Sequence, residues 1–217
     1  MQTHVDSEQL LSYEKELWQK HEYIAGVDEV GRGPIAGPVA AAAVILKKNS
    51  HGTATVRIDD SKKLTKKQRE EAYKWITQNA LSYAVGIIRA DEIDRVNILE
   101  ATTLAMKKAI LELTPQPEHL LIDGRAVKGM PYSQTNIVGG DGKSLSIAAA
   151  SIIAKVVRDK IMEDYALKYS VYDFHKNKGY GTAKHVDAIV EHGFSPIHRR
   201  SFRLKKLEAR GFYHEAS

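Results

Sequence analysis

Blocks of apolar residues along the chain predict short strands, and segments with helical spacing lie between them. Residues 23–30 and 37–46 are strongly apolar and are separated by a Gly-Pro turn, which predicts two strands. Three further segments are short and rich in residues that favour strands, namely 81–89, 118–122 and 135–138. The segments with a helical pattern are 6–20, a run that follows Thr65 and extends to about Asn79, 97–113, 145–168, 183–191 and a basic tail from Phe202.

The order of these elements predicts the fold class. Strands that alternate with helices are typical of a layered α/β domain. The later, all-helical part of the chain would pack beside the sheet or extend from it. The sequence contains no internal repeat, no low-complexity tract and no linker rich in Gly, Pro or Ser.

Composition limits the cellular compartment and the kinds of cross-link and metal site that are expected. The 217 residues contain no cysteine, so neither disulfides nor thiolate metal sites are available. The first residues lack the apolar core of a signal peptide, and the longest apolar run, 38–46, is too short to span a bilayer. We therefore expect a cytoplasmic protein with no membrane association.

The charge balance is basic, with 32 Lys and Arg residues against 27 Asp and Glu. Basic residues concentrate in SKKLTKKQR, 61–69, and in HRRSFRLKK, 198–206. If both segments lie on one face, they would form a phosphate-facing surface for a polyanion. The alternative is that each is simply the solvated face of a helix.

Acidic residues follow strand-like segments at three places. Asp28 and Glu29 stand near the end of the first predicted strand, Asp123 ends HLLID, and Asp141 follows TNIV through a Gly-Gly turn. In an α/β sheet, ligands usually bind at the edge where strands end. Carboxylates brought together there would repel each other, and a hard divalent cation such as Mg²⁺ or Mn²⁺ would compensate them. Asp-Gly is also a common turn pair, so Asp123 or Asp141 taken alone could be a turn residue.

Two segments resemble nucleotide-binding motifs but match them only in part. GRGPIA, 31–36, fits G-x-G-x-x-A, but a proline and a second strand follow it and no acid stands about 20 residues further on. VGGDGKS, 138–144, resembles a phosphate loop, but Ile137 stands where that motif needs glycine. No G-x-S-x-G or H-E-x-x-H is present, so a serine hydrolase or a zinc protease lacks support.

Two glycine-containing loops could contact a ligand directly. Gly31 and Gly33 would let the backbone approach it closely, and Arg32 between them supplies a fork of donors. Tyr180, between two glycines in KNKGYGT, could stack on a sugar or base or donate its hydroxyl. Plain turns and ordinary packing are the competing interpretations.

Seven motifs in series resemble the type 2 ribonuclease H family, and within it the bacterial ribonuclease HII group. The resemblance runs from about Tyr23 to about Phe202. The glycine-arginine-glycine form points to HII over HIII. In chain order the motifs are GVDEVGRGPIAGPV, DDSKKL, NILEAT, LLIDG, GGDGKSLSIAAASIIAKVVRD, HKNKGYGT and HRRSF.

The resemblance assigns roles to particular residues. Asp28, Glu29, Asp123 and Asp141 match the family's catalytic, metal-binding carboxylates, with Asp159 a rival for the fourth place. The residues that match the substrate-binding set are Gly31, Arg32, Gly33, Lys62 and Tyr180. Among them, the loop and Tyr180 would recognise the ribonucleotide 2′-hydroxyl, and Lys62 would lie near the substrate phosphates.

The resemblance also implies a fold and an activity. The fold is a ribonuclease H-like mixed central sheet flanked by helices, in a domain spanning 23–217 that includes a C-terminal helical portion, after an N-terminal helical extension, 1–22. The implied activity is endonucleolytic cleavage of the RNA strand of RNA/DNA hybrids, and cleavage 5′ of single ribonucleotides in duplex DNA. Two Mg²⁺ or Mn²⁺ ions would support it, leaving 5′-phosphate and 3′-hydroxyl ends, and a monomer is expected. The alternative is a nucleic-acid-binding protein with the same fold and no catalysis.

Overall fold

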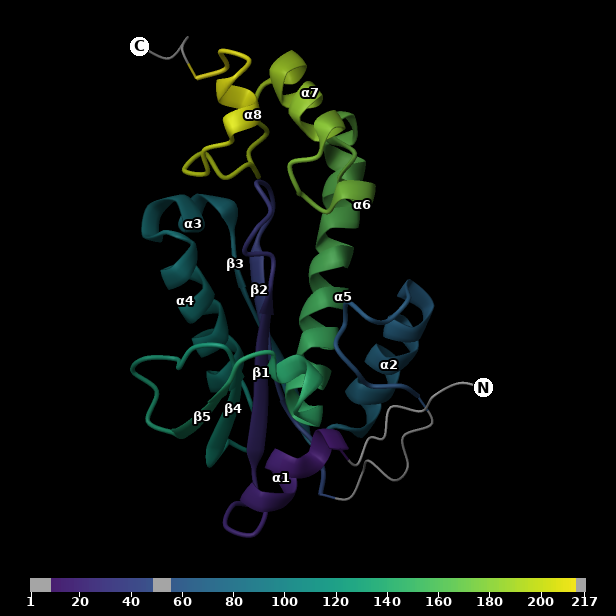
Figure 1. Cartoon of the computed structure of the whole chain (residues 1–217), viewed down its shortest axis with the longest axis vertical. Helices are drawn as coiled ribbons and strands as arrows, with labels where there is room; N and C mark the ends of the chain where they lie inside the picture. The colour runs from purple at the N-terminus through teal and green to yellow at the C-terminus, as the bar shows by residue number, and fades with distance from the viewer. Residues whose placement is uncertain (1–8, 49–55, 214–217) are drawn as a thin grey trace.

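A mixed five-stranded sheet forms the centre of the molecule (Figure 1). The computed structural model describes residues 9–48 and 56–213. The strand order is β3-β2-β1-β4-β5, in which β1 pairs antiparallel with β2 and parallel with β4. The mixed sheet expected from the sequence is confirmed. The strands are β1 (Ile24–Val30), β2 (Val39–Ile45), β3 (Ser82–Ile88), β4 (His119–Asp123) and β5 (Ser133–Ile137).

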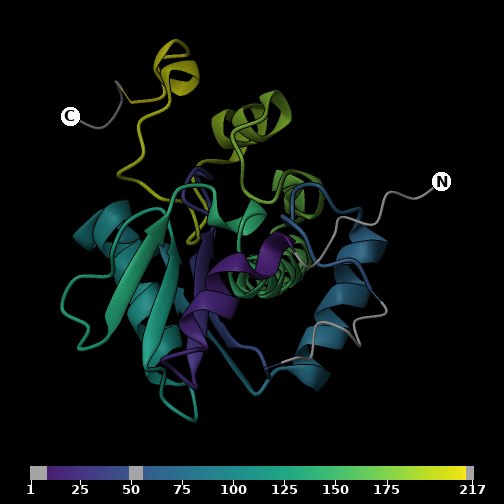
Figure 2. The ribbon, with the colours of Figure 1, turned by 60° about the horizontal axis from the view of Figure 1, so that its bottom comes forward.

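Helices cover both faces of this sheet. On one face α4 packs against β2 and β3, whereas α5 packs against β1 and β2 on the other, with α2 outside it (Figures 1 and 2). Short 3-10 turns, η1 (Gln9–Leu11), η3 (Gly140–Gly142) and η4 (Ser170–Tyr172), lead into α1, α5 and α6. The α-helices are α1 (Ser12–Leu17), α2 (Lys66–Asn79), α3 (Ala90–Val96), α4 (Ile98–Leu111), α5 (Leu145–Lys168), α6 (Phe174–Asn177), α7 (Ala183–His192) and α8 (Lys205–Glu208).

Most predicted elements are present, and local chemistry explains their limits. The helix predicted over 145–168 is confirmed at both ends. The helix expected to follow Thr65 and run to about Asn79 is confirmed as α2, and Thr65 is its N-cap, in a capping box with Gln68. The strand expected at 135–138 instead covers 133–137.

Three expectations need correction. Helix α3 was not predicted, and Asn97, with a φ of 69°, separates it from α4, which Asn97 caps. The helix expected over 6–20 is a 3-10 turn followed by the six-residue α1, and residues 6–8 lie outside the described part. The tail from Phe202 contains only the single-turn α8.

Beyond the sheet, the end of α5 carries a second hydrophobic cluster. Residues from α5, α6, α7 and α8 surround Phe174 and Met162, which are fully buried. This is the C-terminal helical portion, at the top of Figure 1. None of the helices in residues 9–48 and 56–213 combines the length and hydrophobicity needed to cross a bilayer.

The first helix contributes a buried anion to the start of α5. The Glu14 carboxylate accepts hydrogen bonds from the Ser144 hydroxyl at 2.6 Å, the Ser146 amide at 2.9 Å and the Ser146 hydroxyl at 2.7 Å. Glu14 is 1% exposed. A helix N-terminus favours negative charge, and Glu14 supplies it from within the chain.

Helix α5 approaches β1 so closely that no side chain fits between them at Gly26. A Cβ built on Gly26 would lie 2.0 Å from the carbonyl carbon of Ser146 and 2.3 Å from the amide of Ile147. Both are backbone atoms of the first turn of α5, so they cannot rotate away. The absence of a side chain at residue 26 therefore sets the depth at which α5 sits on the sheet.

We predict that Gly26→Ala destabilises the protein by about 1–3 kcal/mol or more, because α5 must shift off the strand. Gly181→Ala is the control, since its Cβ would meet only ordinary contacts at 3.5–3.6 Å. That variant should stay within about 0.5 kcal/mol of wild type. Denaturant unfolding measures both, and an unchanged midpoint for Gly26→Ala would contradict the packing described.

Candidate active site

Three carboxylates from separate segments meet at one end of the sheet. Strands β1 and β4 run parallel, and Val27 pairs with Ile122, so the next residues, Asp28 and Asp123, stand side by side. Asp141 reaches them from η3, the turn that precedes α5. One oxygen from each of the three side chains lies within 4.8 Å of the others. Of the four carboxylates predicted to converge, these three are brought together.

Asp28 is the most deeply buried of the three and the least favourably placed as an anion. It is 4% exposed. Burial raises the pKa of Asp28 well above its ordinary value, the charges of Glu29 and Asp123 add to this, and a hydrogen bond from Ser151 opposes it. The site therefore holds negative charge that the described residues compensate only in part.

Asp123 and Asp141 are linked to their surroundings by short polar contacts. The Gly140 amide donates to Asp123 Oδ1 at 2.8 Å, which joins the end of β4 to the turn carrying Asp141. Lys62 Nζ donates to Asp141 Oδ2 at 3.2 Å. Burial lowers the pKa of Lys62, but the hydrogen bond and charge of Asp141 outweigh it and raise the pKa overall. A cationic group from the chain thus already lies against the carboxylates.

Glu29 does not belong to this group of three. Adjacent strand residues point to opposite faces, so Glu29 faces away from Asp28. Its carboxylate accepts a hydrogen bond from Arg32 at 3.2 Å. Burial raises the pKa of Glu29, the hydrogen bond and charge of Arg32 lower it, and the charge of Asp123 raises it. The Glu29 carboxylate therefore lies near enough to Asp28 and Asp123, at the end of the strand, for their charges to interact.

Asp159, the rival for the fourth acidic position, lies apart from the group. It is one turn along α5 from Lys155, whose ammonium donates to it at 2.7 Å. With Lys66, Lys160 and Glu163 it lines a groove between α2 and α5. The structure thus brings Asp141, and not Asp159, next to Asp28 and Asp123.

The glycine loop continues directly from β1 and contacts the second predicted loop. Gly31 has a φ of 93°, and a Cβ there would lie 2.2 Å from Arg158 Nε. A Cβ on Gly33 would lie 3.6 Å from Tyr180 Cε1, so the edge of the tyrosine ring lies beside this exposed glycine. Gly179 accepts hydrogen bonds from the amides of Ile35 and Ala36. The two loops predicted to contact ligand therefore form one unit beside the acids.

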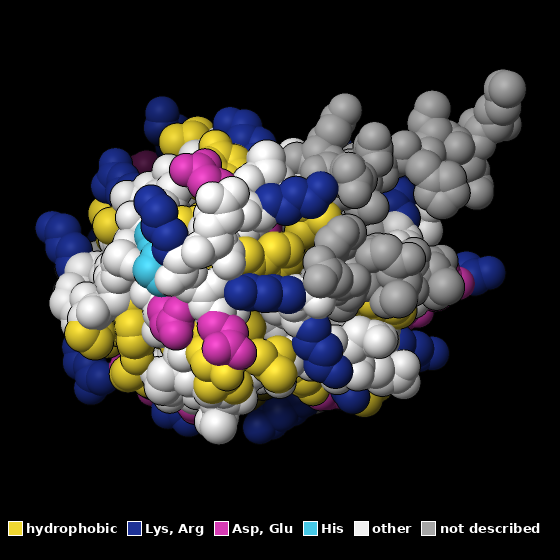
Figure 3. All heavy atoms as spheres, turned by 90° about the horizontal axis from the view of Figure 1, so that it is seen from below, with side chains coloured by type: hydrophobic (Ala, Val, Ile, Leu, Met, Phe, Trp, Pro, Cys, Tyr) yellow, Lys and Arg dark blue, Asp and Glu magenta, His cyan; other side chains and the backbone are white. Residues whose placement is uncertain are grey.

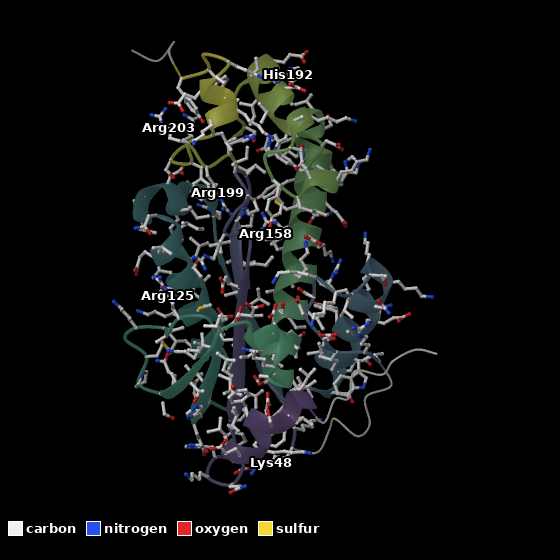
Figure 4. All side chains as sticks on the ribbon, in the orientation of Figure 1. Lys48, Arg125, Arg158, His192, Arg199 and Arg203 are labelled. Atoms are coloured by element: carbon white, nitrogen blue, oxygen red, sulfur yellow. The ribbon has the colours of Figure 1, made fainter. Side chains whose placement is uncertain are left out.

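Two buried arginines hold this unit through backbone carbonyls (Figure 4). Arg199 donates to the carbonyls of Gly31, Arg32, Pro34 and Gly37 at 2.6–3.1 Å. Burial, with repulsion from Arg158, lowers the pKa of Arg199 to about 9, so it stays charged at neutral pH.

Arg158 holds the adjoining backbone in the same way. It donates to the carbonyls of Ala36 and Pro38, and to that of Lys178 in the tyrosine loop. It is 1% exposed, and burial lowers its pKa to about 10. Like Arg199, it remains a cation whose partners are carbonyl dipoles of the loops.

The two basic segments contribute to the interior of the molecule as well as to its surface. His198 and Arg199, within the basic segment 198–206, are buried and bonded inside the molecule. In the segment 61–69, Arg69 donates to the carbonyls of Ser61 and Leu64, while the lysines are exposed. On the face seen from below, basic and acidic side chains are interspersed (Figure 3). Much of the basic sequence therefore organises backbone.

Sequence reasoning overlooked the polar residues of α5 that face the sheet. Ser151 bonds Asp28, and Arg158 lies below the glycine loop. A signal was available, because both belong to a helical stripe of buried positions in which a charged residue is out of place. The stripe is Ile147, Ser151, Ala154, Arg158 and Met162.

The start of α5 does not resemble the phosphate-binding turn of a nucleotide-binding loop. The hydroxyl of Ser144 and the amide of Ser146 bond the Glu14 carboxylate. An internal anion thus occupies the place where such a loop receives phosphate.

With this geometry in view, comparisons identify the family. The family model described as Ribonuclease HII matches residues 25–205. The chain belongs to the ribonuclease HII family. A ribonuclease HII from Endomicrobium trichonymphae is 52% identical over 195 residues, which cover 89% of this chain and 91% of that protein.

Solved ribonuclease structures share the fold. The ribonuclease H2 of Pyrococcus horikoshii OT3 superposes with a TM-score of 0.76 at 28% identity, covering 88% of this chain and 99% of that one. Bst-RNase HIII, solved in complex with Mn²⁺, gives a TM-score of 0.66 at 19% identity, covering 87% and 70%. The latter likeness supports the fold alone.

Membership in the ribonuclease HII family establishes the class of reaction. The protein is an endoribonuclease, a hydrolase that acts on RNA/DNA hybrids. The resemblance, the fold and the predicted endoribonuclease activity on RNA/DNA hybrids are thereby confirmed, and the alternative of a non-catalytic binder is not favoured.

We predict that Asp28→Asn stabilises the metal-free protein at pH 8. A raised folded-state pKa means that folding disfavours the charged form, so wild type loses stability as pH rises from the unfolded value of 3.8 through the folded one. Asparagine removes this loss. The measurement is denaturant unfolding in EDTA at pH 4 to 8.

Asp159→Asn is the control, because it breaks an ion pair with Lys155 on the same helix. It should cost about 0.3–0.5 kcal/mol. If Asp28→Asn proves no more stable than wild type at pH 8, the buried charge is already compensated and the description of Asp28 is wrong.

Proposed function

We propose that the protein cleaves RNA/DNA hybrids, and duplex DNA with a single embedded ribonucleotide, on the 5′ side of a ribonucleotide. The products carry 5′-phosphate and 3′-hydroxyl ends. Asp28, Glu29, Asp123 and Asp141 are the catalytic residues in this proposal. The observation that carries it is the meeting of three carboxylates beside a glycine loop that Tyr180 flanks.

The acids fit divalent cations by the chemistry of their donors. Carboxylate oxygens are the ligands that Mg²⁺ and Mn²⁺ prefer. The raised pKa of Asp28 and the ammonium of Lys62 against Asp141 both indicate a place that favours positive charge. We infer that Asp28, Asp123 and Asp141, with Glu29 at the strand end, hold two such ions. Bound there, the ions would supply positive charge at the scissile phosphate and an acidified water as nucleophile.

The loops beside the acids suit a ribose. Gly31 and Gly33 present backbone without side chains, and Tyr180 lies beside Gly33 with its side chain half exposed. A protein distinguishes RNA from DNA at a given sugar through its 2′-hydroxyl, which both donates and accepts hydrogen bonds. We infer that the loop backbone and the phenol contact this hydroxyl and so position the adjacent phosphate at the acids.

Two cations near the acids would contact substrate phosphates. Arg32 and Lys62 are half or more exposed, and each is bonded to an acid of the site, Glu29 and Asp141 respectively. Both can rotate toward a nucleic-acid backbone without unfolding any element. In this proposal Lys62 adds to binding, and Arg32 belongs to the substrate-binding loop with Gly31 and Gly33.

The decisive experiment uses a DNA duplex containing one ribonucleotide, with and without Mg²⁺. Wild type should cut once, 5′ of that residue, only with the metal. Asp28→Asn should fall below about one-hundredth of the wild-type rate, because it removes charge stabilisation at the reacting phosphate. It should still bind the duplex. Wild-type turnover by this variant would overturn the metal assignment, and binding without cleavage by wild type would favour the non-catalytic alternative.

We predict that Lys62→Ala weakens duplex binding and lowers the salt slope of log K by about 0.9, the value for one phosphate contact. Binding is measured in the Asp28→Asn background so that substrate stays intact. Lys67→Ala is the matched control, since Lys67 lies in the same basic segment with its side chain 87% exposed. Equal slopes for the two variants would place Lys62 among solvated surface residues.

A further inference from the structure

We propose that the buried pair His185–His198 is a positioning device that fixes Tyr180 beside the glycine loop. This inference rests on the proposed role of Tyr180 in recognising the ribose. His185 lies on α7 and His198 in the segment that follows it. Their Nε2 atoms are 2.9 Å apart, and both residues are almost completely buried.

The partners of the two rings determine the position of every proton. The Ser195 backbone amide can only donate, and it points at His198 Nδ1 at 2.9 Å, so this nitrogen accepts. A neutral His198 then carries its proton on Nε2 and donates to His185 Nε2. His185 therefore carries its proton on Nδ1, where the Tyr180 carbonyl, which can only accept, lies at 2.9 Å.

This chain of hydrogen bonds begins at the Ser195 amide, which can only donate, and ends at the Tyr180 carbonyl, which can only accept. Only one tautomer of each ring therefore satisfies it. Adding a proton to either ring would place two N–H groups against each other across 2.9 Å. Burial lowers the pKa of both histidines, and repulsion from His185 and Arg200 helps to lower that of His198 to about 3. Tyr172 and Phe174 pack against both rings. The pair is thus a neutral, rigid connection.

The connection ends on the residue whose side chain lies beside the glycine loop. The Tyr180 carbonyl accepts from His185 and from the Thr182 amide, and its own amide donates to the carbonyl of Asn177. With its backbone held at both ends, the ring lies against Gly33. The next residue after His198 is Arg199, which holds the carbonyls of the glycine loop. Neighbouring side chains of one short segment therefore fix both halves of the proposed ribose site.

The test uses two replacements, each of which can keep the hydrogen bond made by one ring nitrogen of His185. The amide nitrogen of His185→Asn can occupy the Nδ1 position and donate to Tyr180. The side-chain oxygen of His185→Gln can occupy the Nε2 position and accept from His198, but this variant loses the donor to Tyr180. Cleavage rates are measured on a duplex with one ribonucleotide and on a uniform RNA/DNA hybrid. His192→Gln, at the exposed end of the same helix, is the control.

We expect His185→Gln to lower kcat/KM on the single-ribonucleotide duplex about three- to tenfold, the effect of one lost hydrogen bond, and to affect the uniform hybrid less. His185→Asn should recover most of the loss. In the Tyr180→Ala background, His185→Gln should cause no further decrease, because both changes act through one side chain. Equal losses on both substrates, or additive losses in the double variant, would overturn the inference.

Failure of the proposed function is recognisable separately. If Tyr180→Ala alone cleaves the single-ribonucleotide duplex like wild type, then Tyr180 does not recognise the ribose and the inference falls with it. If Tyr180→Ala is impaired while His185→Gln is not, only the positioning role is wrong. Nitrogen NMR of the wild type provides a check that needs no variant. It should detect one Nδ1-protonated and one Nε2-protonated histidine, both neutral at pH 6, and any other pair of tautomers would contradict the geometry.

Discussion

The close seating of α5 on β1 is the constraint on which the rest of the molecule depends. Where the two meet, Gly26 leaves room only for backbone against backbone. The same helix then passes Asp28 with Ser151 and the glycine loop with Arg158. Because α5 contacts both, its position on the sheet fixes where the loops lie relative to the acids. A shift of α5 along the sheet would move both relationships together, so the spacing of the proposed catalytic and recognition groups is a property of this single interface.

Around that interface, cations and anions serve different purposes according to depth. The fully buried arginines, Arg158 and Arg199, meet carbonyl oxygens and give shape to loops. The exposed cations, Lys62 and Arg32, meet the acids and are free to leave them. Among the acids, Asp28 is the one whose burial is least offset, which is consistent with a site that becomes electrostatically balanced only with added positive charge. Under the proposed function, stability and activity therefore make opposite demands on this carboxylate.

Much of the fold followed from short-range chemistry that the sequence displays. The limits of α5 and the cap at Thr65 are local, and the acids at strand ends were visible because adjacent charges are unusual in an apolar strand. What could not be foreseen was long-range. The sequence around Asp28 and Glu29 does not show that their side chains leave the strand on opposite faces, where Glu29 meets Arg32. Nor does the motif HRRSF show that Arg199 is buried and donates to backbone carbonyls. His185 gave no signal either, since its partners come from residues 180 and 198.

The carboxylate of Glu14 has a consequence for the boundaries of the folding unit. It lies upstream of the region, residues 25–205, that carries the family likeness, yet it satisfies the first turn of the longest helix. A fragment trimmed to the recognisable region would leave the hydroxyls of Ser144 and Ser146 facing an empty, water-poor gap at the very point where α5 meets the sheet. The folding unit therefore includes α1 as well as the residues 25–205 that the family model matches, because Glu14 of α1 caps the first turn of α5.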